Sequence, residues 1–284
     1  MNVNASRKQD GATVIQAKEL SITVETGLPL VDVSNLEKNI LEILGDKSEY
    51  YGIYIHDLKR NITVGINEDK LYGPGSISKL PVGLLIMMEI DKGNLKLQDT
   101  ITYLSQDFTD PTNVLTADYI GTSFLIADYL RFLIIDSDNA SIRLLERVLG
   151  GYEAVNERTR EELGAEHFFR YPHQASALSI GRVFKGLYNE SYLTNENNEY
   201  FLDLLKNTHP SLQTGIPVGV PKDIAIAHKT GIVPTYPGYA WNDAGIVYGN
   251  KTDYVLVVIN SYVAIPDARR NIQDISRVVY QSLN

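Results

Sequence analysis

The sequence contains no cysteine and only five histidines, and both shortages limit the chemistry that the chain can perform. Without thiols it has no disulfide, no thiolate nucleophile and no cysteine-ligated metal. The histidines show neither His-x-x-x-His nor His-Glu-x-x-His spacing, so no zinc site is expected. We therefore expect an activity that uses neither a metal nor another cofactor.

The chain also lacks an excess of basic residues and any long apolar run. It carries 26 Lys and Arg against 35 Asp and Glu, a formal net charge of -9. Because no basic excess is left to neutralise phosphates, we expect no nucleic-acid partner. No apolar run approaches the length of a membrane span, and the first residues lack the apolar core of a signal peptide. At 284 residues, 44% of them hydrophobic, the chain can bury a substantial core.

The first part of the chain predicts a leader, a helix and a hairpin. Residues 1–33 are predicted to be a flexible leader, with a possible short strand over the alternating residues 20–24. Ser34 and Glu37 form a capping-box pattern that predicts an amphipathic helix over residues 34–44. Two β-type runs at 51–58 and 62–66, separated by a turn, predict a hairpin.

The rest of the chain predicts a block of helices, then strands and a last helix. Helices are expected at 80–90, 123–135, 140–149, 152–163, 177–188, 197–206 and 268–283, and strands at 224–231, 245–248 and 254–259. This order predicts an α+β fold, in which strands from both ends form one antiparallel sheet flanked by helices. Residues 34–284 would form a single catalytic domain, with a helical subdomain over about 76–210. A site is expected in the cleft between the sheet and this subdomain.

Ser76 and Lys79 lie three residues apart where an apolar helix begins. The Gly and Pro residues of 71–75 break regular structure, which places Ser76 at or near the helix N-terminus. Residues three apart share a helix face, so Lys79 should project beside the Ser76 hydroxyl. A lysine whose pKa is lowered by burial can activate a serine as a nucleophile. Taken alone, a serine at this place is more often only a helix cap.

Two further motifs supply polar residues that could act on a substrate together with Ser76. Ser137-Asp138-Asn139 lies on a predicted turn between two helices, and Lys229-Thr230-Gly231 ends a β-type run. In this order the three motifs resemble the signature set of the class A β-lactamase and penicillin-binding protein superfamily, the penicillin-recognising serine hydrolases. The resemblance runs from about Leu36 to the C-terminus and includes residues 79–82, 93–101 and 149–151.

The resemblance implies a role for each residue of the first two motifs. Ser76 would be the acylated nucleophile, and Lys79 would help to deprotonate it. Ser137 would relay a proton towards the leaving nitrogen, because a hydroxyl both donates and accepts. Asn139 would hold the amide carbonyl of the substrate, whereas Asp138 would brace the turn.

The third motif would bind the acid group of the substrate and complete the oxyanion hole. By the same resemblance, Lys229 and Thr230 would bind the carboxylate of a β-lactam or of a D-alanyl terminus. Gly231 would let the substrate lie close to the strand as an added edge. The oxyanion hole would consist of the backbone N–H groups of Ser76 and Ile232.

The sequence departs from the class A pattern where an omega-loop glutamate should activate the deacylating water. The matching region, residues 161–174, is short and lacks the Glu-x-x-Leu-Asn pattern. Gln174 lies near the expected position, and an amide cannot take a proton from water. His173 is a weak candidate for a substitute base. The basic residue that the family has on the next strand is also missing, with Asn242 and Asp243 near its place.

We therefore expect complete acylation machinery, compromised deacylation and a long-lived acyl-enzyme. Three functions stay open: a class A-type hydrolase of β-lactams, a D-alanyl-D-alanine peptidase acting on cell-wall peptides, and a non-catalytic acyl-accepting sensor. The expected partner is a small β-lactam or a D-Ala-D-Ala-type peptide, bound by a monomer. The resemblance implies an extracytoplasmic location, although this sequence shows no signal peptide.

Overall fold

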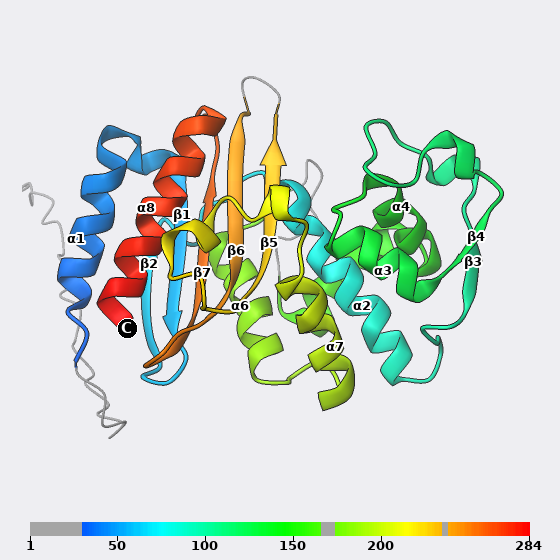
Figure 1. Ribbon diagram of the computed structural model, residues 1–284, viewed down its shortest axis with the longest axis horizontal. Coiled ribbons are helices and arrows are strands. Elements are labelled where there is room, and N and C mark those ends of the chain that lie inside the picture. The colour runs from blue at the N-terminus through cyan, green and yellow to red at the C-terminus, as the bar shows by residue number, and fades with distance from the viewer. Residues whose placement is uncertain (1–29, 166–173, 235–237) are drawn as a thin grey trace, which may run out of the picture.

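The computed structural model describes residues 30–165, 174–234 and 238–284 (Figure 1). The strand predicted at 20–24 and the candidate base His173 lie outside the described residues. Residues 1–29 of the predicted leader also lie outside the described residues.

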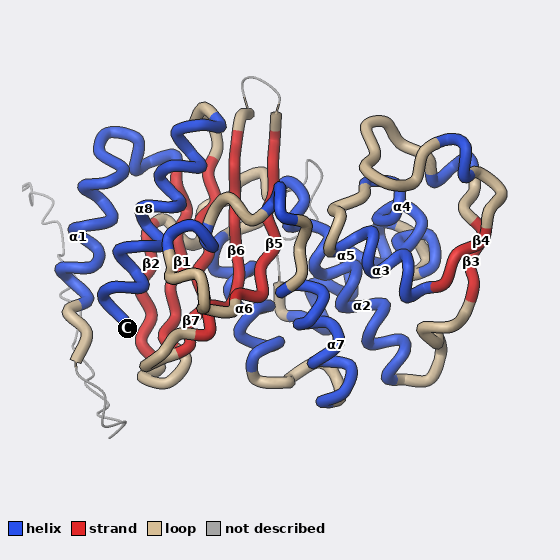
Figure 2. Tube along the Cα trace, in the orientation of Figure 1, coloured by secondary structure: helices blue, strands red, loops and turns tan. Residues whose placement is uncertain are grey.

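A five-stranded antiparallel sheet forms the centre of the fold, as predicted. Its strand order is β2-β1-β7-β6-β5, so strands from the two ends of the sequence pair through β1 and β7 (Figure 2). The central strand β7 is buried over almost its whole length, which explains its continuous apolar run. The strands are β1 (Tyr51–Asp57), β2 (Ile62–Ile66), β5 (Ile226–Val233), β6 (Ala240–Tyr248) and β7 (Asp253–Asn260).

Helices cover both faces of this sheet. Helices α1 (Val33–Leu44) and α8 (Ile265–Leu283) lie side by side on one face, where they bury residues such as Leu36, Ile40 and Ile272 (Figure 1). Helix α6 (Ala177–Tyr188) packs on the other face against β1, β6 and β7. The predicted capping box of α1 is wrong. The cap is Asp32, whose carboxylate accepts a hydrogen bond from the Asn35 N–H at 3.0 Å.

The helical block is built around α2 (Lys79–Asp91), which follows directly on the short 3₁₀ turn η2 (Gly75–Ser78). Residues 79–87 of α2 are all buried, because other helices surround it. Those helices are α3 (Ile126–Ile134), α4 (Asn139–Val148), α5 (Tyr152–Leu163) and α7 (Asn195–Lys206). The other 3₁₀ turns are η1 (Gly45–Tyr50), η3 (Ser105–Asp107), η4 (Ala117–Tyr119), η5 (Pro210–Leu212) and η6 (Ile216–Gly219).

The start of the helix predicted at 123–135 is wrong. Strand β4 (Ser123–Leu125) pairs there with β3 (Thr100–Thr102), and the Thr102 and Ser123 hydroxyls lie 2.9 Å apart. Helix α3 begins only after Leu125, whose N–H donates to the Asp128 carboxylate at 3.3 Å. The local apolar pattern continues through both elements, so only the pairing with a distant strand separates them.

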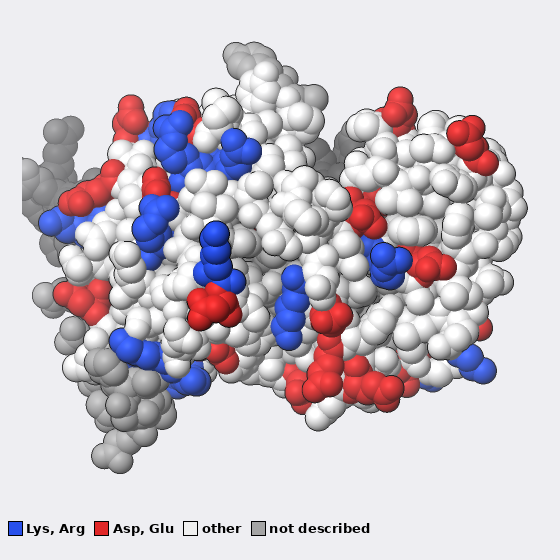
Figure 3. All heavy atoms as spheres, viewed as in Figure 1, with Lys and Arg blue, Asp and Glu red and all other residues white. Residues whose placement is uncertain are grey.

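The surface is charged and mixed in sign. On the face shown in Figure 3, basic and acidic side chains are interspersed over the helices. Among the described residues, no helix is both long and apolar enough to cross a membrane.

Gly181 lets α6 approach the sheet, and this contact can be tested. A Cβ at this position would lie 2.2 Å from the Tyr54 ring of β1, so Gly181→Ala must displace the helix or the ring. Overpacking of this kind costs about 1–3 kcal/mol in the free energy of unfolding. Arg182→Ala, on the exposed side of the same helix, should change it by about 0.5 kcal/mol or less. Chemical denaturation of both variants measures the difference, and equal stabilities would contradict the packing argument.

Candidate active site

Ser76 lies in η2, which is pressed against β5 through two glycines. Gly75 has a φ of +58°, and a Cβ there would lie 2.7 Å from the Ile232 nitrogen. A Cβ at Gly231 would lie 2.0 Å from the Pro74 carbonyl oxygen. Both positions therefore require glycine because the two segments touch. The contact with Pro74 gives a structural reason for Gly231, and its expected place beside the substrate stays a prediction.

Lys79 lies beside Ser76, as its spacing predicted. Its Nζ is 2.7 Å from the Ser76 hydroxyl oxygen and 2.7 Å from Asn139 Oδ1. Only 3% of Lys79 is exposed, and this burial lowers its pKa to about 8. The carboxylates of Asp138 and Glu146 act in the opposite direction. The amine thus has an accessible neutral form next to the hydroxyl that it would have to deprotonate.

Asp138 holds the turn between α3 and α4, which bears out its predicted bracing role. It is fully buried, and one carboxylate oxygen accepts from the backbone N–H groups of residues 113–115 at 2.7–3.2 Å and from the Thr112 hydroxyl. The other oxygen caps α4 through Ser141. Burial alone would raise the pKa of Asp138, but these hydrogen bonds lower it below its ordinary value. The turn places Ser137 in the left-handed region, with a φ of +56°.

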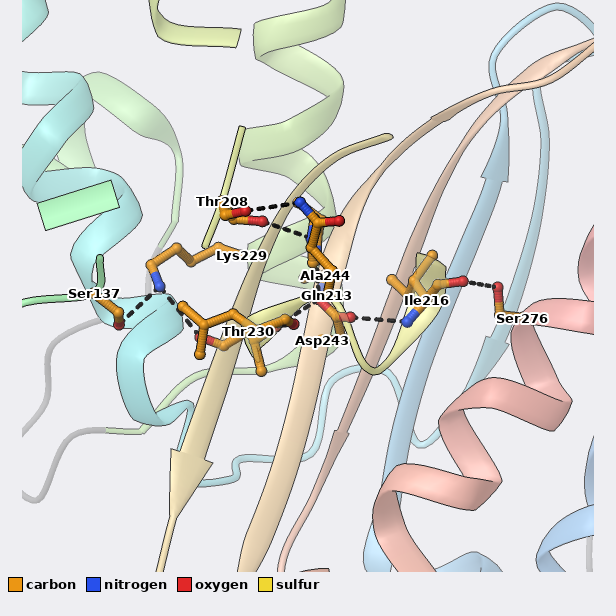
Figure 4. A network of polar contacts seen from close by, with 11 residues as sticks. Ser137, Thr208, Gln213, Ile216, Lys229, Thr230, Asp243, Ala244 and Ser276 are labelled. Atoms are coloured by element: carbon orange, nitrogen blue, oxygen red, sulfur yellow. Dashed lines mark hydrogen bonds and ion pairs between the residues drawn. The ribbon is translucent and has the colours of Figure 1, made fainter. Parts of the chain in front are cut away.

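Lys229 of the third motif contacts Ser137 of the second motif. Its Nζ is 2.9 Å from the Ser137 hydroxyl, and Figure 4 shows the side chain reaching from β5 towards the helical block. Lys229 is fully buried, and this burial holds its pKa well below the ordinary value for lysine. The nearby Lys79 acts in the same direction, whereas Asp243 opposes it.

A buried polar network behind β5 was not predicted. His228 contacts Asp243 through Nδ1 and the Thr208 hydroxyl through Nε2, each at 2.9 Å. The Thr230 hydroxyl donates to the Leu212 carbonyl at 2.8 Å (Figure 4). Asp243 also accepts from the backbone N–H of Ile216 at 2.8 Å.

This network explains the residues found where a basic residue was expected. Asp243 is occupied by the contacts just described, and Asn242 donates to the Gly73 carbonyl at 2.8 Å. Both side chains are fully buried and serve the fold. Because each contact joins segments far apart in the sequence, no local sequence pattern predicts these contacts.

The predicted residues meet at a cleft between the sheet and the helical block. One cavity of about 540 Å³ is lined by residues of all three motifs together with Ile232, including Ser76, Ser137, Asn139 and Thr230. A second cavity, of about 790 Å³, lies on the other side of Ser76 and includes Lys79 and Glu146. Lys229 lies beneath the first cavity rather than in its wall.

Glu146 was missed by sequence reasoning. The available signal was its position seven residues after Asn139, which places both on one face of α4.

In the ranges that the structure describes, no group of three His, Asp or Glu side chains could hold a metal ion.

Residues 35–283 match the model of the β-lactamase enzyme family. The chain belongs to this family.

Individual relatives of this β-lactamase family member agree with the assignment. The chain is 25% identical to β-lactamase VEB-1 of Pseudomonas aeruginosa over 253 residues, which is 81% of this chain and 82% of that protein. A β-lactamase of Chitinophaga pinensis has the same fold, with a TM-score of 0.81 and 23% identity over 88% of this chain and all of that one. PBP-A matches with a TM-score of 0.81 and 21% identity over 88% of this chain and 96% of its own. A mutant of PBP-A was solved as an acyl-enzyme with penicillin G.

The contacts of Asp138 predict a large effect of a small substitution. Asp138→Asn replaces an acceptor oxygen by an N–H₂ group that faces backbone donors, so we expect unfolding to become easier by at least about 2 kcal/mol. Asp136→Asn, two residues earlier on the same turn, is the matched control and should lose far less. Urea denaturation compares the two. Equal loss in both variants would contradict the assigned role.

Proposed function

We propose that this family member is a serine hydrolase that recognises β-lactams and becomes acylated at Ser76. The observation that carries the proposal is the 2.7 Å contact between the Lys79 amine and the Ser76 hydroxyl, in a site where burial lowers the pKa of Lys79 to about 8. A half-buried serine that is hydrogen-bonded to a buried amine is what nucleophilic activation requires. Membership of the β-lactamase family supports the same reaction class.

Acylation begins with transfer of the Ser76 proton to neutral Lys79. The Oγ atom forms a bond to the carbonyl carbon, and the oxyanion is bound by the N–H groups of Ser76 and Ile232, which are worth about 3 kcal/mol each in sites of this type. The Ile232 nitrogen faces η2, close to Gly75. Ser137 then passes a proton to the leaving nitrogen as its bond to the carbonyl carbon breaks. The contact of Ser137 with Lys229 lets that proton be replaced.

The substrate would be oriented by its two polar ends. Asn139 accepts a contact from Lys79 through Oδ1, and its amide nitrogen donates to the Pro111 carbonyl at 2.8 Å, so the side chain is fixed beside the cavity to hold an amide carbonyl. Lys229 and Thr230 would bind the carboxylate. An anion would stabilise the charged form of Lys229, which burial now disfavours.

Deacylation is proposed to be slow. Gln174 lies near the place of the missing glutamate and supplies no base. PBP-A, which shares the fold, was trapped as an acyl-enzyme in mutant form. The same two observations favour a second candidate, a D-alanyl-D-alanine peptidase of the penicillin-binding type. In either case we propose that the protein acts outside the cytoplasm as a monomer.

A penicillin should leave a persistent adduct on this chain. Mass spectrometry of the intact protein after mixing should show the added mass of the penicillin, and peptide mapping should place it on Ser76. Ser76→Ala should show none, whereas Ser282→Ala at the exposed end of α8 should react like the parent chain. Rapid turnover without an adduct would refute slow deacylation, and no reaction at all would refute the proposed function.

Two substrates separate the candidate functions. Nitrocefin hydrolysis measures β-lactamase activity, and release of D-alanine from a cell-wall pentapeptide measures peptidase activity. Preference for the pentapeptide would favour the second candidate over the first.

The acylation rate should depend on pH through Lys79. Since only the neutral amine can accept the Ser76 proton, kinact/KI for a fluorescent penicillin should rise with pH and level off above about 8, the pKa of Lys79. Measurements between pH 6 and 9 test this. A rate that is flat across this range would exclude Lys79 as the base.

A further inference from the structure

Glu146 lies in the wall of the second cavity, which it shares with Ser76 and Lys79. It follows Asn139 by seven residues on α4, so the two side chains share one helix face about 10 Å apart along the axis. Asn139 itself contacts Lys79. The volume of about 790 Å³ is many times that of one water molecule, roughly 30 Å³, so solvent can lie between Glu146 and the serine.

The Glu146 carboxylate has no hydrogen bond or ion pair to any of the described residues. Other interior carboxylates differ, since Asp138 accepts several hydrogen bonds and Asp107 is paired with Arg147. Because it is half-buried in the cavity wall and no described residue holds it by a hydrogen bond or ion pair, the carboxylate can contact a molecule in the cavity.

The charged and titratable groups around Glu146 come from three helices. Arg143 lies on its own helix α4, Lys79 on α2 and Tyr152 on α5. Burial raises the pKa of Glu146 to about 7, and Arg143 and Lys79 limit the rise. A carboxylate of this kind is half ionised near neutral pH and can both take up and release a proton.

We propose that Glu146 is the general base that activates the water which hydrolyses the acyl-enzyme. This inference rests on the proposed function, because it needs an ester on Ser76. The water oxygen bonds to the ester carbonyl carbon while one of its protons passes to the Glu146 carboxylate. The tetrahedral intermediate then breaks its bond to Ser76 Oγ, which takes a proton from the Lys79 ammonium. Lys79 is then neutral, as it was before acylation, and Glu146 releases its proton to solvent as the acid product leaves.

The position of Glu146 also accounts for slow hydrolysis. It lies two helical turns beyond Asn139, so the water it activates has to bridge the space to the ester. Glu146 therefore supplies a base, which Gln174 cannot, but it acts through water across the space that separates it from the ester on Ser76.

The test is the decay of a preformed adduct. The parent chain, Glu146→Gln and the control Glu153→Gln, which changes an exposed carboxylate on α5, are each acylated with a penicillin and freed of excess reagent. Mass spectrometry then follows the loss of the adduct. We expect Glu146→Gln to slow this loss by roughly 10²–10⁴-fold and Glu153→Gln to decay like the parent.

A second measurement needs no variant, so the inference stays testable if Glu146→Gln folds poorly. The decay rate of the parent adduct should rise as the pH passes through about 7, where Glu146 becomes ionised. Equal decay of the Glu146→Gln and parent adducts, or a decay rate independent of pH, would overturn the assignment of Glu146. Failure of the parent chain to form any adduct would instead overturn the proposed function.

Discussion

The burial of the Lys79 amine is the constraint on which the site depends. An ammonium group loses its hydration in the interior, so its pKa falls and the neutral form becomes available. This requires a lysine in the first turn of a helix that is surrounded on all sides. The helical block satisfies that condition by packing its other helices around α2. The reactivity of Ser76 is therefore a property of the packing of the whole block rather than of one motif.

A second buried lysine adds to this constraint. Lys229 comes from the sheet and contacts Ser137, while Lys79 comes from the helical block and contacts Ser76. Burial lowers the pKa of Lys229, and the nearby Lys79 amine acts in the same direction. Asp243 opposes this effect on Lys229, as Asp138 and Glu146 oppose it on Lys79. The protonation of Lys229 therefore depends on charges from both the helical block and the sheet, which are distant in the sequence.

The sequence allowed much of this arrangement to be predicted, for reasons that differ between elements. The Ser76–Lys79 contact follows from helix geometry, and the hairpin and most helices follow from periodicity. Strand β4 was not predicted because it depends on pairing with β3. The Asp32 cap was not predicted because Ser34 offers a capping pattern in the same segment. The catalytic and substrate-binding roles assigned to the motif residues came from the family resemblance and stay predictions.

The contacts behind β5 could not be predicted at all. The network of His228, Asp243 and Thr208 depends on the register of β5 against β6 and on the loop that follows α7. The family resemblance places a deacylation base in the segment after α5, and the candidate there, His173, lies outside the described residues. The sequence gives no sign of the proposed role of Glu146, because a glutamate on an amphipathic helix ordinarily faces solvent.

The place of β5 in the sheet has a consequence for solubility. It is an outermost strand, and an open strand edge invites pairing with another copy of the chain. Here η2 and α7 pack against β5. Both elements cover part of this edge, and the cleft lies where residues of β5 stay open to a ligand. Selection for a reactive pocket and selection against self-association act on the same few contacts.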